Sequence, residues 1–258
     1  MKVVMIGAGN LATQLSLSML RLPNIQFVQV YSHTMAHAEE LAGCLGTVAC
    51  NHPKKVRNDA DLYVFALKDA VLEDIAASIP GNEGLWIHTA GSMPMELFAN
   101  YTKRYGVLYP LQTFSRHRNV NFSSIPLFLE CKQKSDYLIL EGLAKQLSDK
   151  VQFLSSDSRR YLHLAAVFAC NFTNHMYVLA GQLLNSAGVS ENLLFPLIDE
   201  TAAKIHDMSP INAQTGPAVR YDENVLQKHL ELLSEANQPN MQVIYQLLSQ
   251  SIHQYSMK

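Results

Sequence analysis

Residues 3–12 read VVMIGAGNLA, and this stretch decides the fold. An apolar run with β-branched residues ends in Gly-x-Gly-x-x-Ala, and a helical pattern begins immediately after it. Gly7 permits a tight turn, and Gly9 lets the backbone approach a pyrophosphate with no side chain in the way. Ala12 keeps the helix close to the strand, and the unpaired N–H groups at the helix start attract phosphate. The stretch therefore predicts a dinucleotide-binding turn, although a tight turn without a ligand is the alternative. The expected cofactor-binding residues are Gly7, Gly9, Asn10 and Leu11.

The composition is that of an ordinary globular chain. Its 258 residues suffice for one large domain or two modest ones. A formal net charge of -2 provides no basic field, so we expect neither nucleic acid nor a membrane as partner. The apolar N-terminal run contains glycines and continues into a helix, unlike a signal peptide. The 4 cysteines lack metal-ligand spacing, which indicates reduced thiols in a cytoplasmic protein, with Cys44 and Cys170 as small core residues.

The first part of the chain alternates β-rich runs with helical patterns. Strands are expected at residues 2–7, 26–31, 47–50, 62–66, 85–88, 106–109, 127–130 and 151–154. Helices are expected at residues 10–20, 35–45, 70–77, 93–100 and 134–147. This alternation predicts an α/β fold, a Rossmann doubly wound parallel sheet. Several strands are almost entirely apolar, as expected when helices cover both faces.

Beyond Ser156 the strand signal disappears. Helices are expected at residues 157–186, 190–208, 222–236 and 240–254, with a loop at 209–221. We therefore predict two domains without a flexible linker. Residues 1–155 form the dinucleotide-binding domain, and residues 156–258 form an all-α domain for substrate binding and dimerisation.

The residues after strand 26–31 bear on the choice of dinucleotide. An Asp or Glu at this place selects NAD by hydrogen bonding to the ribose 2′-hydroxyl. Here the chain reads Ser32-His33-Thr34, with no acid before Glu39. A carboxylate would repel a 2′-phosphate, whereas hydroxyls and an imidazole can donate hydrogen bonds to it. The sequence therefore favours NADP(H) over NAD, although the usual arginine is absent and Thr34 could serve only as a helix cap.

Two features near this segment are weaker signals. Lys54 and Lys55 could add positive charge, but the sequence does not place them relative to the cofactor. His33 and His37 have the spacing of a metal-ligand pair. No third ligand is in view, so a solvated helix face is the preferred interpretation, and no metal is expected.

Ligands of open α/β sheets bind beyond the carboxyl ends of the strands. The residues at the ends of strands 62–66 and 85–88 are therefore candidates for cofactor contact: Ala66, Leu67, Lys68, Thr89, Gly91 and Ser92. Small residues there leave room for the nicotinamide ribose or ring. Lys68 could contact a phosphate or a substrate carboxylate, or could lie in a solvated turn.

The expected helix 157–186 carries the candidates for acid chemistry. Reduction of a carbonyl or imine needs an acid that protonates the product heteroatom. His163 and Asn171 lie eight residues apart on an apolar stretch, about 80° around an α-helix, and could line one groove. The alternative is a hydrogen-bonded core residue in each case. Histidine titrates near neutral pH, so His163 is the preferred catalytic candidate.

Residues 215–222, TGPAVRYD, provide a second candidate. Gly-Pro makes a rigid turn, and an Arg on a rigid loop at a helix start is a good clamp for a carboxylate or phosphate. Arg220 is therefore a candidate for the substrate site. The alternative is a surface arginine paired with Asp222 or Glu223.

These segments resemble the Rossmann-like proteins with a DUF2520 C-terminal domain. Such proteins are often labelled NADP oxidoreductases of the F420-dependent type and belong to the 6-phosphogluconate dehydrogenase-like superfamily. The matching segments are residues 7–12, 31–34, 88–92, 109–115, 163–171 and 215–222, of which the last is the most specific. The resemblance implies an N-terminal NADP-binding domain, a helical C-terminal domain and a homodimer joined through the helices. Pyrroline-5-carboxylate reductase and ketopantoate reductase are more distant relatives in fold, but the catalytic lysine of the latter is not evident here.

The preferred interpretation is an NADP-dependent oxidoreductase that transfers hydride between NADP(H) and a small carbonyl or imine substrate. A narrower form of it is an imine reductase similar to pyrroline-5-carboxylate reductase. The competing interpretation is a non-catalytic dinucleotide-binding protein, such as a redox sensor. The expected catalytic residues are His163, Asn171 and Arg220.

Overall fold

The computed structural model describes residues 1–116, 118 and 120–257. Eight strands form one sheet with the order β3-β2-β1-β4-β5-β6-β7-β8. Their bounds are β1 Lys2–Ile6, β2 Gln26–Tyr31, β3 Ala49–Cys50, β4 Leu62–Phe65, β5 Leu85–His88, β6 Tyr105–Pro110, β7 Leu127–Cys131 and β8 Val151–Phe153. The chain leaves β1 for β2 on one side and later returns to β4 on the other. The strand order therefore reverses beside β1, which is where doubly wound sheets bind their ligands. The expected α/β fold is confirmed.

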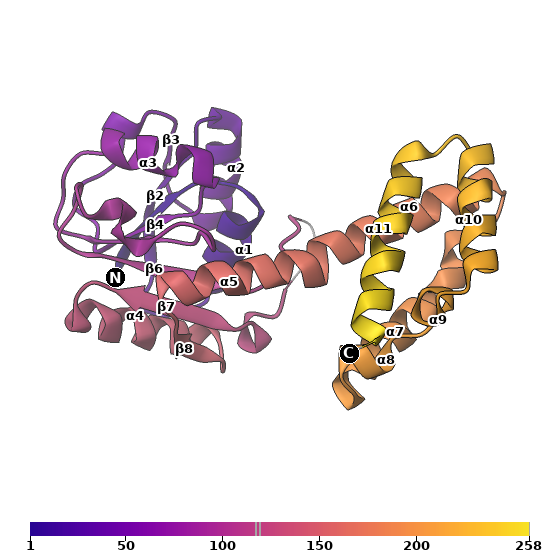
Figure 1. Ribbon diagram of the computed structural model, residues 1–258. Helices are drawn as coiled ribbons and strands as arrows, with labels where there is room; N and C mark the ends of the chain where they lie inside the picture. The colour runs from indigo at the N-terminus through magenta and orange to yellow at the C-terminus, as the bar shows by residue number, and fades with distance from the viewer. Residues whose placement is uncertain (117, 119, 258) are drawn as a thin grey trace. The chain divides into compact units, whose positions relative to one another are not determined.

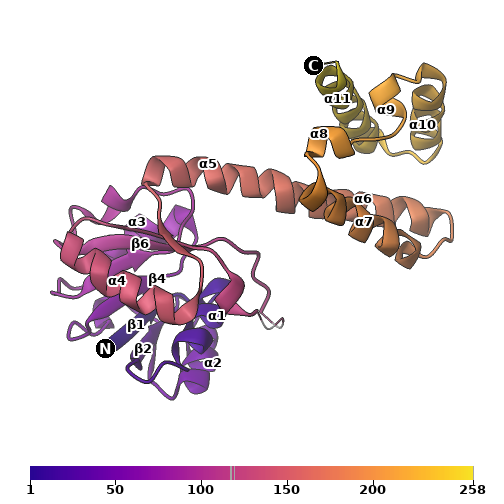
Figure 2. The same cartoon turned by 90° about the horizontal axis from the view of Figure 1, so that it is seen from below.

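Helices cover both faces of the sheet (Figures 1 and 2). They are α1 Asn10–Met19, α2 Met35–Leu45, η1 Pro53–Lys55, α3 Asp69–Ser78, η2 Met95–Phe98, η3 Phe122–Ser124, α4 Lys134–Leu147 and α5 Ser156–Ala166. The apolar faces of α1, α2 and α4 share one core with alternate strand residues such as Met5 and Val64. The intervening residues, such as Ile6 and Phe65, pack with α3 and η2 in a second core. Burial on both faces explains why these strands read as continuous apolar runs.

The last two strands, β7 and β8, run opposite to the other strands. β7 pairs antiparallel to β6, with Tyr109 opposite Phe128, whereas β8 pairs parallel to β7. Residues 111–126 contain only the short η3 among the residues described there. This connection returns the chain in the opposite direction, so β7 begins beside the end of β6. The fold is a mostly parallel sheet.

The chain separates into two compact units, residues 1–170 and 171–258. The second unit contains η5 Glu191–Leu194 and the helices α6 Thr173–Ser186, α7 Phe195–Asp207, α8 Pro210–Ala213, α9 Pro217–Arg220, α10 Glu223–Glu235 and α11 Pro239–Ser256. Within it α11 packs against α9 and α10. No helix in the described part of the chain is long and apolar enough to cross a membrane.

Four local expectations need correction. The helix expected at residues 93–100 is only the 3-10 turn η2, because Pro94 precedes it and the chain leaves the helix again after Phe98. The loop expected at 209–221 contains α8 and α9, each with Pro at its start, where proline favours a helix. The long helix expected at 157–186 is interrupted by a π-helix at Val167–Phe172. Cys44 and Cys170 are exposed rather than buried, although all four cysteines are free.

Candidate functional site

The turn between β1 and α1 has the geometry that phosphate binding requires. Gly7 has a φ of +119°, and a Cβ there would lie 2.2 Å from the Ala66 carbonyl oxygen, so only glycine fits. A Cβ on Gly9 would meet no described atom within 4 Å, so the space above the helix start is open. Gly9 is the N-cap of α1, and the first turn carries no acidic residue. The first N–H groups of α1 and its positive dipole end therefore face an open cradle that suits an anion.

The loop after β6 is attached beside this cradle. The Asn10 side-chain amide donates to the Phe114 carbonyl oxygen at 3.1 Å. Gln14, one turn further along α1, donates to the carbonyl oxygens of Ser115 and Arg116. Asn10 thus uses its side chain to hold a loop, which leaves its backbone N–H as the group for a phosphate. Leu11 is half-buried beside it, at the first turn of the helix.

The end of β2 carries the three residues expected to read the adenosine ribose. The Ser32 N–H donates to the Cys50 carbonyl oxygen at the end of β3, whereas the side chains of His33 and Thr34 are exposed. Thr34 occupies the N-cap of α2 but makes no side-chain capping bond, and the first turn of α2 contains no acid. The Thr34 hydroxyl and the start of α2 can therefore both serve an anion.

The structure also places two lysines that the sequence left open. β3 runs parallel to β2, with Cys50 opposite Tyr31, so the residues after both strands lie at the same edge of the sheet. The turn η1 follows β3 at that edge and carries Lys54 and Lys55, both exposed. They add positive charge to the edge where Ser32, His33 and Thr34 lie.

Some of the polar side chains after β4 and β5 form hydrogen bonds within the protein, and others do not. Ala66 and Leu67 are half-buried, and Lys68 is exposed at the N-cap of α3. The buried Thr89 hydroxyl donates to the Phe65 carbonyl oxygen at 3.4 Å, which is a structural use. The Ser92 hydroxyl donates to the Asp69 carboxylate in the first turn of α3. Of this set, Lys68 is the polar side chain without a hydrogen-bond or ion-pair partner among the described residues.

His163 projects from α5 onto this same edge of the first unit. A Cβ on Gly91 would lie 2.6 Å from both Cγ and Nδ1 of His163, so the imidazole rests directly on the Gly91 backbone. The Tyr109 hydroxyl lies 3.1 Å from His163 Nδ1, and the two rings meet edge to face. The ring is hydrogen bonded and half-buried, which agrees with the hydrogen-bonded alternative, and the catalytic role of His163 stays a prediction.

A buried ion pair holds α5 in this position. Arg159, four residues before His163, is fully buried. Its guanidinium donates to Glu130 Oε2 on β7 at 3.0 Å and to the Met93 carbonyl oxygen at 2.6 Å. The Ser156 hydroxyl donates to the same Glu130 oxygen at 2.6 Å and accepts from the Met95 N–H. The first turn of α5 is thereby attached both to the sheet and to the loop that follows Gly91.

Burial shifts the protonation of the neighbouring groups. Desolvation, helped by the Arg159 charge, lowers the pKa of His88 to about 3. His88 is therefore neutral; its Nδ1 accepts from the Ala90 N–H, and its Nε2 lies 3.3 Å from the Pro94 carbonyl oxygen. Desolvation also raises the pKa of Tyr109, against a smaller opposite effect of Arg159. The Tyr109 hydroxyl is therefore protonated at neutral pH.

The other two expected catalytic residues belong to the second unit. Asn171 and Arg220 are both exposed. The angle of 80° between His163 and Asn171 assumed 3.6 residues per turn throughout, and the π-helix at Val167–Phe172, with its longer turn, invalidates that count. Asp222 caps α10 by accepting from the Val225 N–H, and no ion pair joins Arg220 to an acid within the described chain.

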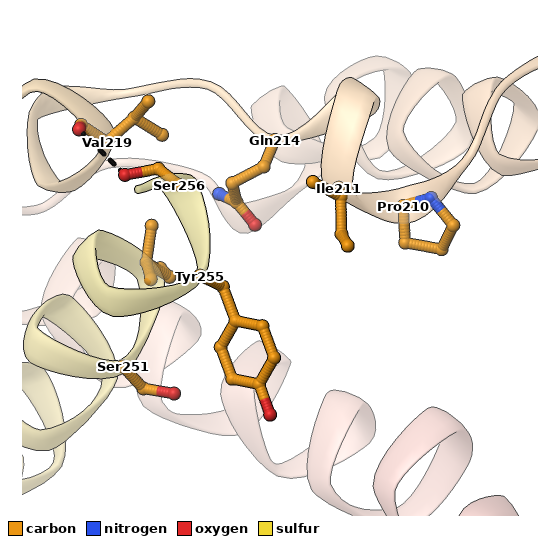
Figure 3. Close-up of a pocket in the computed structure, with 8 residues that line it drawn as sticks. Pro210, Ile211, Gln214, Val219, Ser251, Tyr255 and Ser256 are labelled. Atoms are coloured by element: carbon orange, nitrogen blue, oxygen red, sulfur yellow. Dashed lines mark hydrogen bonds between the residues drawn. The ribbon is translucent and has the colours of Figure 1, made fainter. Parts of the chain in front are cut away.

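The segment that carries Arg220 borders a hollow in the second unit (Figure 3). The hollow has a volume of about 220 Å³ and lies between α8, α9 and the end of α11, where Pro210, Gln214 and Tyr255 are among its walls. The Ser256 hydroxyl donates to the Val219 carbonyl oxygen at 3.2 Å, directly before Arg220. This bond ties α9 to α11 and holds the Arg220 backbone in place.

Among the described residues, no cluster of His, Cys, Asp and Glu could bind a metal.

The sequence interpretation missed four residues of the site: His88, Tyr109, Glu130 and Arg159. Arg159 had a usable signal, because it lies four residues before His163 and thus on the same helix face. Tyr109 ends an apolar strand at the carboxyl edge, which also marks it. Glu130 had no comparable signal, since its partner is 29 residues away in the chain.

The strand order, the Gly-x-Gly-x-x-Ala turn and the open helix start define a Rossmann-like protein of the dinucleotide-binding class. The sequence profile of DUF2520, a domain of unknown function, matches residues 125–252. The crystal structure of "putative NADP oxidoreductase BF3122 from Bacteroides fragilis" is similar with a TM-score of 0.91 and 46% sequence identity, over 98% of this chain and 98% of that one. The chain therefore belongs to the family of this Bacteroides fragilis protein, as the sequence resemblance implied.

Two solved structures of low identity share the fold. The imine reductase from Myxococcus stipitatus in complex with NADP⁺ has a TM-score of 0.70 and 16% identity, over 98% of this chain and 93% of that one. The reductive aminase from Aspergillus terreus in complex with NADPH4, cyclohexanone and allyl amine has a TM-score of 0.70 and 17% identity, over 94% of this chain and 89% of that one. Neither similarity shows more than the fold. No curated protein matches the chain.

Proposed function

We propose that the protein is an NADP-dependent oxidoreductase that reduces a small carbonyl or imine substrate. The observation that carries this proposal is the position of His163. Its imidazole rests on Gly91 at the carboxyl edge of the sheet, and its Nδ1 is bonded to Tyr109. A half-buried imidazole at the edge where such sheets bind a nicotinamide is the group that acid chemistry there requires.

The residues at this edge fit the cofactor. The backbone N–H groups of Asn10 and Leu11 and the space over Gly9 suit the pyrophosphate. Ser32, His33 and Thr34 suit the 2′-phosphate, with Lys54 and Lys55 on the adjacent turn, and no carboxylate stands in the first turn of α2 to repel it. Ala66 and Leu67 are half-buried at the end of β4, where the nicotinamide half would lie, and the His163 ring covers Gly91 next to them. The Bacteroides fragilis relative carries the name "putative NADP oxidoreductase", which supports the same assignment.

Each of this chain's groups has a separate task in the proposed reaction. NADPH, when bound, supplies a hydride to the substrate carbon. His163 gives a proton from its imidazolium form to the carbonyl oxygen or imine nitrogen, and Tyr109 holds the ring. Asn171 and Arg220 orient the substrate, and Lys68 attracts its negative charge if it has one. Residues 1–155 thus bind the cofactor, and residues 156–258 serve the substrate and dimerisation.

We also propose that the second unit joins two copies of this chain. The helix α7 contains no buried residue, and its apolar side chains Phe195, Leu197 and Ile205 are more than half exposed. Leu232 on α10 and Leu247 on α11 are exposed to a similar degree. Monomeric soluble proteins rarely expose so much apolar surface. The net charge of -2 places little repulsion between two copies. Light scattering during size-exclusion chromatography should give twice 28.8 kDa, and a monomer would exclude the proposal.

Calorimetric titration tests the proposed activity first. The protein should bind NADPH in the micromolar range and clearly more tightly than NADH. Oxidation of NADPH is then measured with a panel of small ketones, aldehydes and cyclic imines. His163→Asn should lose turnover while it keeps its affinity for NADPH. If NADPH binds but no substrate is reduced, and His163→Asn binds NADPH as the unchanged protein does, the non-catalytic sensor is the better interpretation.

A further inference from the structure

The contacts of His163 give its two ring nitrogens different environments. Nδ1 lies 3.1 Å from the Tyr109 hydroxyl, whereas Nε2 has no hydrogen-bond partner among the residues that the structure describes. Because Gly91 supports the ring at Cγ and Nδ1, the side of the ring that carries Nε2 is the one left for a ligand. The two nitrogens of a histidine are not equivalent, and the bond made by one decides the protonation of the other.

Tyr109 is held more firmly than a surface tyrosine. It lies on β6, is 7% exposed and stacks on Phe128 of the neighbouring strand. Its hydroxyl is protonated at neutral pH, because burial raises its pKa. A neutral His163 can therefore accept the Tyr109 hydrogen at Nδ1, which leaves the ring hydrogen on Nε2.

We infer that Tyr109 is a positioning residue for His163: its hydroxyl fixes the imidazole ring with Nε2 as the only nitrogen that exchanges a proton with the substrate. This inference rests on the proposed reductase activity for its catalytic meaning, but the pairing itself can be tested without cofactor. The two anchors of α5 cooperate in it. Arg159 fixes the first turn of the helix to Glu130, and Tyr109 fixes the next turn at His163.

A hydroxyl suits this task better than a carboxylate, because it can both donate and accept. When His163 is an imidazolium, Nδ1–H donates to the Tyr109 oxygen, and the Nε2 proton goes to the substrate heteroatom. A bound NADPH would supply hydride to the adjacent carbon, and the heteroatom would take the proton on the electron pair that it gains. The ring is then neutral with its hydrogen on Nδ1, and water returns a proton to Nε2. No charge remains on Tyr109 at any point, so Nδ1 stays bonded throughout the cycle.

The test compares Tyr109→Phe with Tyr105→Phe. Tyr105 is also buried on β6, and its substitution removes the same oxygen atom four residues away on the same face of the strand. ¹⁵N spectra of histidine-labelled protein without cofactor report the protonation of each ring nitrogen, and His163→Asn identifies the His163 signals. At alkaline pH, where the ring is neutral, the unchanged protein should show hydrogen on Nε2 and an accepting Nδ1. Tyr109→Phe should shift the Nδ1 signal and mix the two tautomers, whereas Tyr105→Phe should leave both signals unchanged.

Turnover provides the second measurement. Tyr109→Phe should lower kcat about 10- to 100-fold with little change in KM or in the dissociation constant for NADPH, because the ring loses its orientation and not the binding site. Unchanged ¹⁵N signals and kcat in Tyr109→Phe would overturn the inference. So would a mixture of both tautomers of neutral His163 in the unchanged protein, a result that stands even if Tyr109→Phe does not fold. If no reductase activity exists, the proposed function fails, and the ¹⁵N spectra still decide whether Tyr109 positions His163.

Discussion

Gly91 and His163 approach each other so closely that a Cβ on Gly91 would lie 2.6 Å from the imidazole Cγ. The first residue belongs to the loop after β5 and the second to α5, 72 positions later in the chain. The ring thus uses the missing side chain of Gly91 as its seat. This contact explains why a small residue is needed after β5. The sequence had suggested a different reason, namely room for a nicotinamide.

Gly91→Ala should therefore displace the His163 ring. The displacement separates His163 from Tyr109, and we expect kcat to fall by about 100-fold, as for other misplacements of a reacting group by about 1 Å. Gly142→Ala is the control, because a Cβ at Gly142 meets no described atom within 4 Å. Steady-state kinetics and NADPH titration of both variants check the prediction. A Gly91→Ala protein with normal kcat would contradict it.

The cofactor preference depends on the charge at the end of β2. Ser32→Asp places a carboxylate where the 2′-phosphate of NADPH is expected, between the end of β2 and Lys54 and Lys55. The variant should weaken NADPH binding roughly tenfold or more, with little effect on NADH, because only NADPH carries the repelled phosphate. Calorimetric titration with both cofactors measures the effect, and Ser32→Ala separates it from loss of the hydroxyl. Equal weakening for both cofactors would argue against NADP selection at this position.

The buried ion pair predicts a large loss of stability when only one partner is removed. Arg159→Met leaves the Glu130 carboxylate without its cation in a buried setting, and we expect the free energy of unfolding to fall by about 3 kcal/mol. The double variant Arg159→Met, Glu130→Leu should recover part of this loss. Arg160→Met is the control. Arg160 is the next residue in the chain, and it forms an exposed ion pair with Asp157, so this substitution should change the free energy of unfolding little. Urea denaturation of all four proteins checks the prediction.

The protonation of His88 links stability to pH. Its pKa is about 3 in the folded chain, against 6.5 for the unperturbed group, so between these values the unfolded chain binds a proton that the folded chain does not. The free energy of unfolding should therefore decrease as the pH falls below 6.5, and His88 contributes up to about 1.4 kcal/mol per pH unit to the slope. In His88→Gln this contribution is absent, so its stability should depend less steeply on pH. Urea denaturation at a series of acidic pH values measures the two slopes, and equal slopes would refute the assignment.

The sequence was sufficient for the fold class and for the dinucleotide-binding turn. Apolar runs predict buried strands wherever helices cover both faces, and Gly7 stands where only a residue without Cβ fits. The direction of β7 could not be read in the same way. It depends on the course of residues 111–126 between β6 and β7, where the sequence pattern carries no strong signal.

The candidate site was less accessible from the sequence. His163 was identified by its chemistry, but the hydroxyl that bonds to it comes from Tyr109, 54 positions earlier. The same holds for Arg159 and Glu130, which only the folded chain brings together. The roles expected for Asn171 and Arg220 stay predictions. Long-range pairs of this kind are set by the packing of α5 on the sheet, and no local pattern encodes them.

The imidazole–hydroxyl pair has a consequence for how this family can diversify. Tyr109, His163 and the anchoring Arg159 all belong to residues 1–170. Mutations that reshape residues 171–258 therefore leave the pair intact. Under the proposed function, the helical part can evolve as an exchangeable module: natural selection can retune which substrates are accepted, or a recombination event can replace the module, while the inherited acid stays in working order.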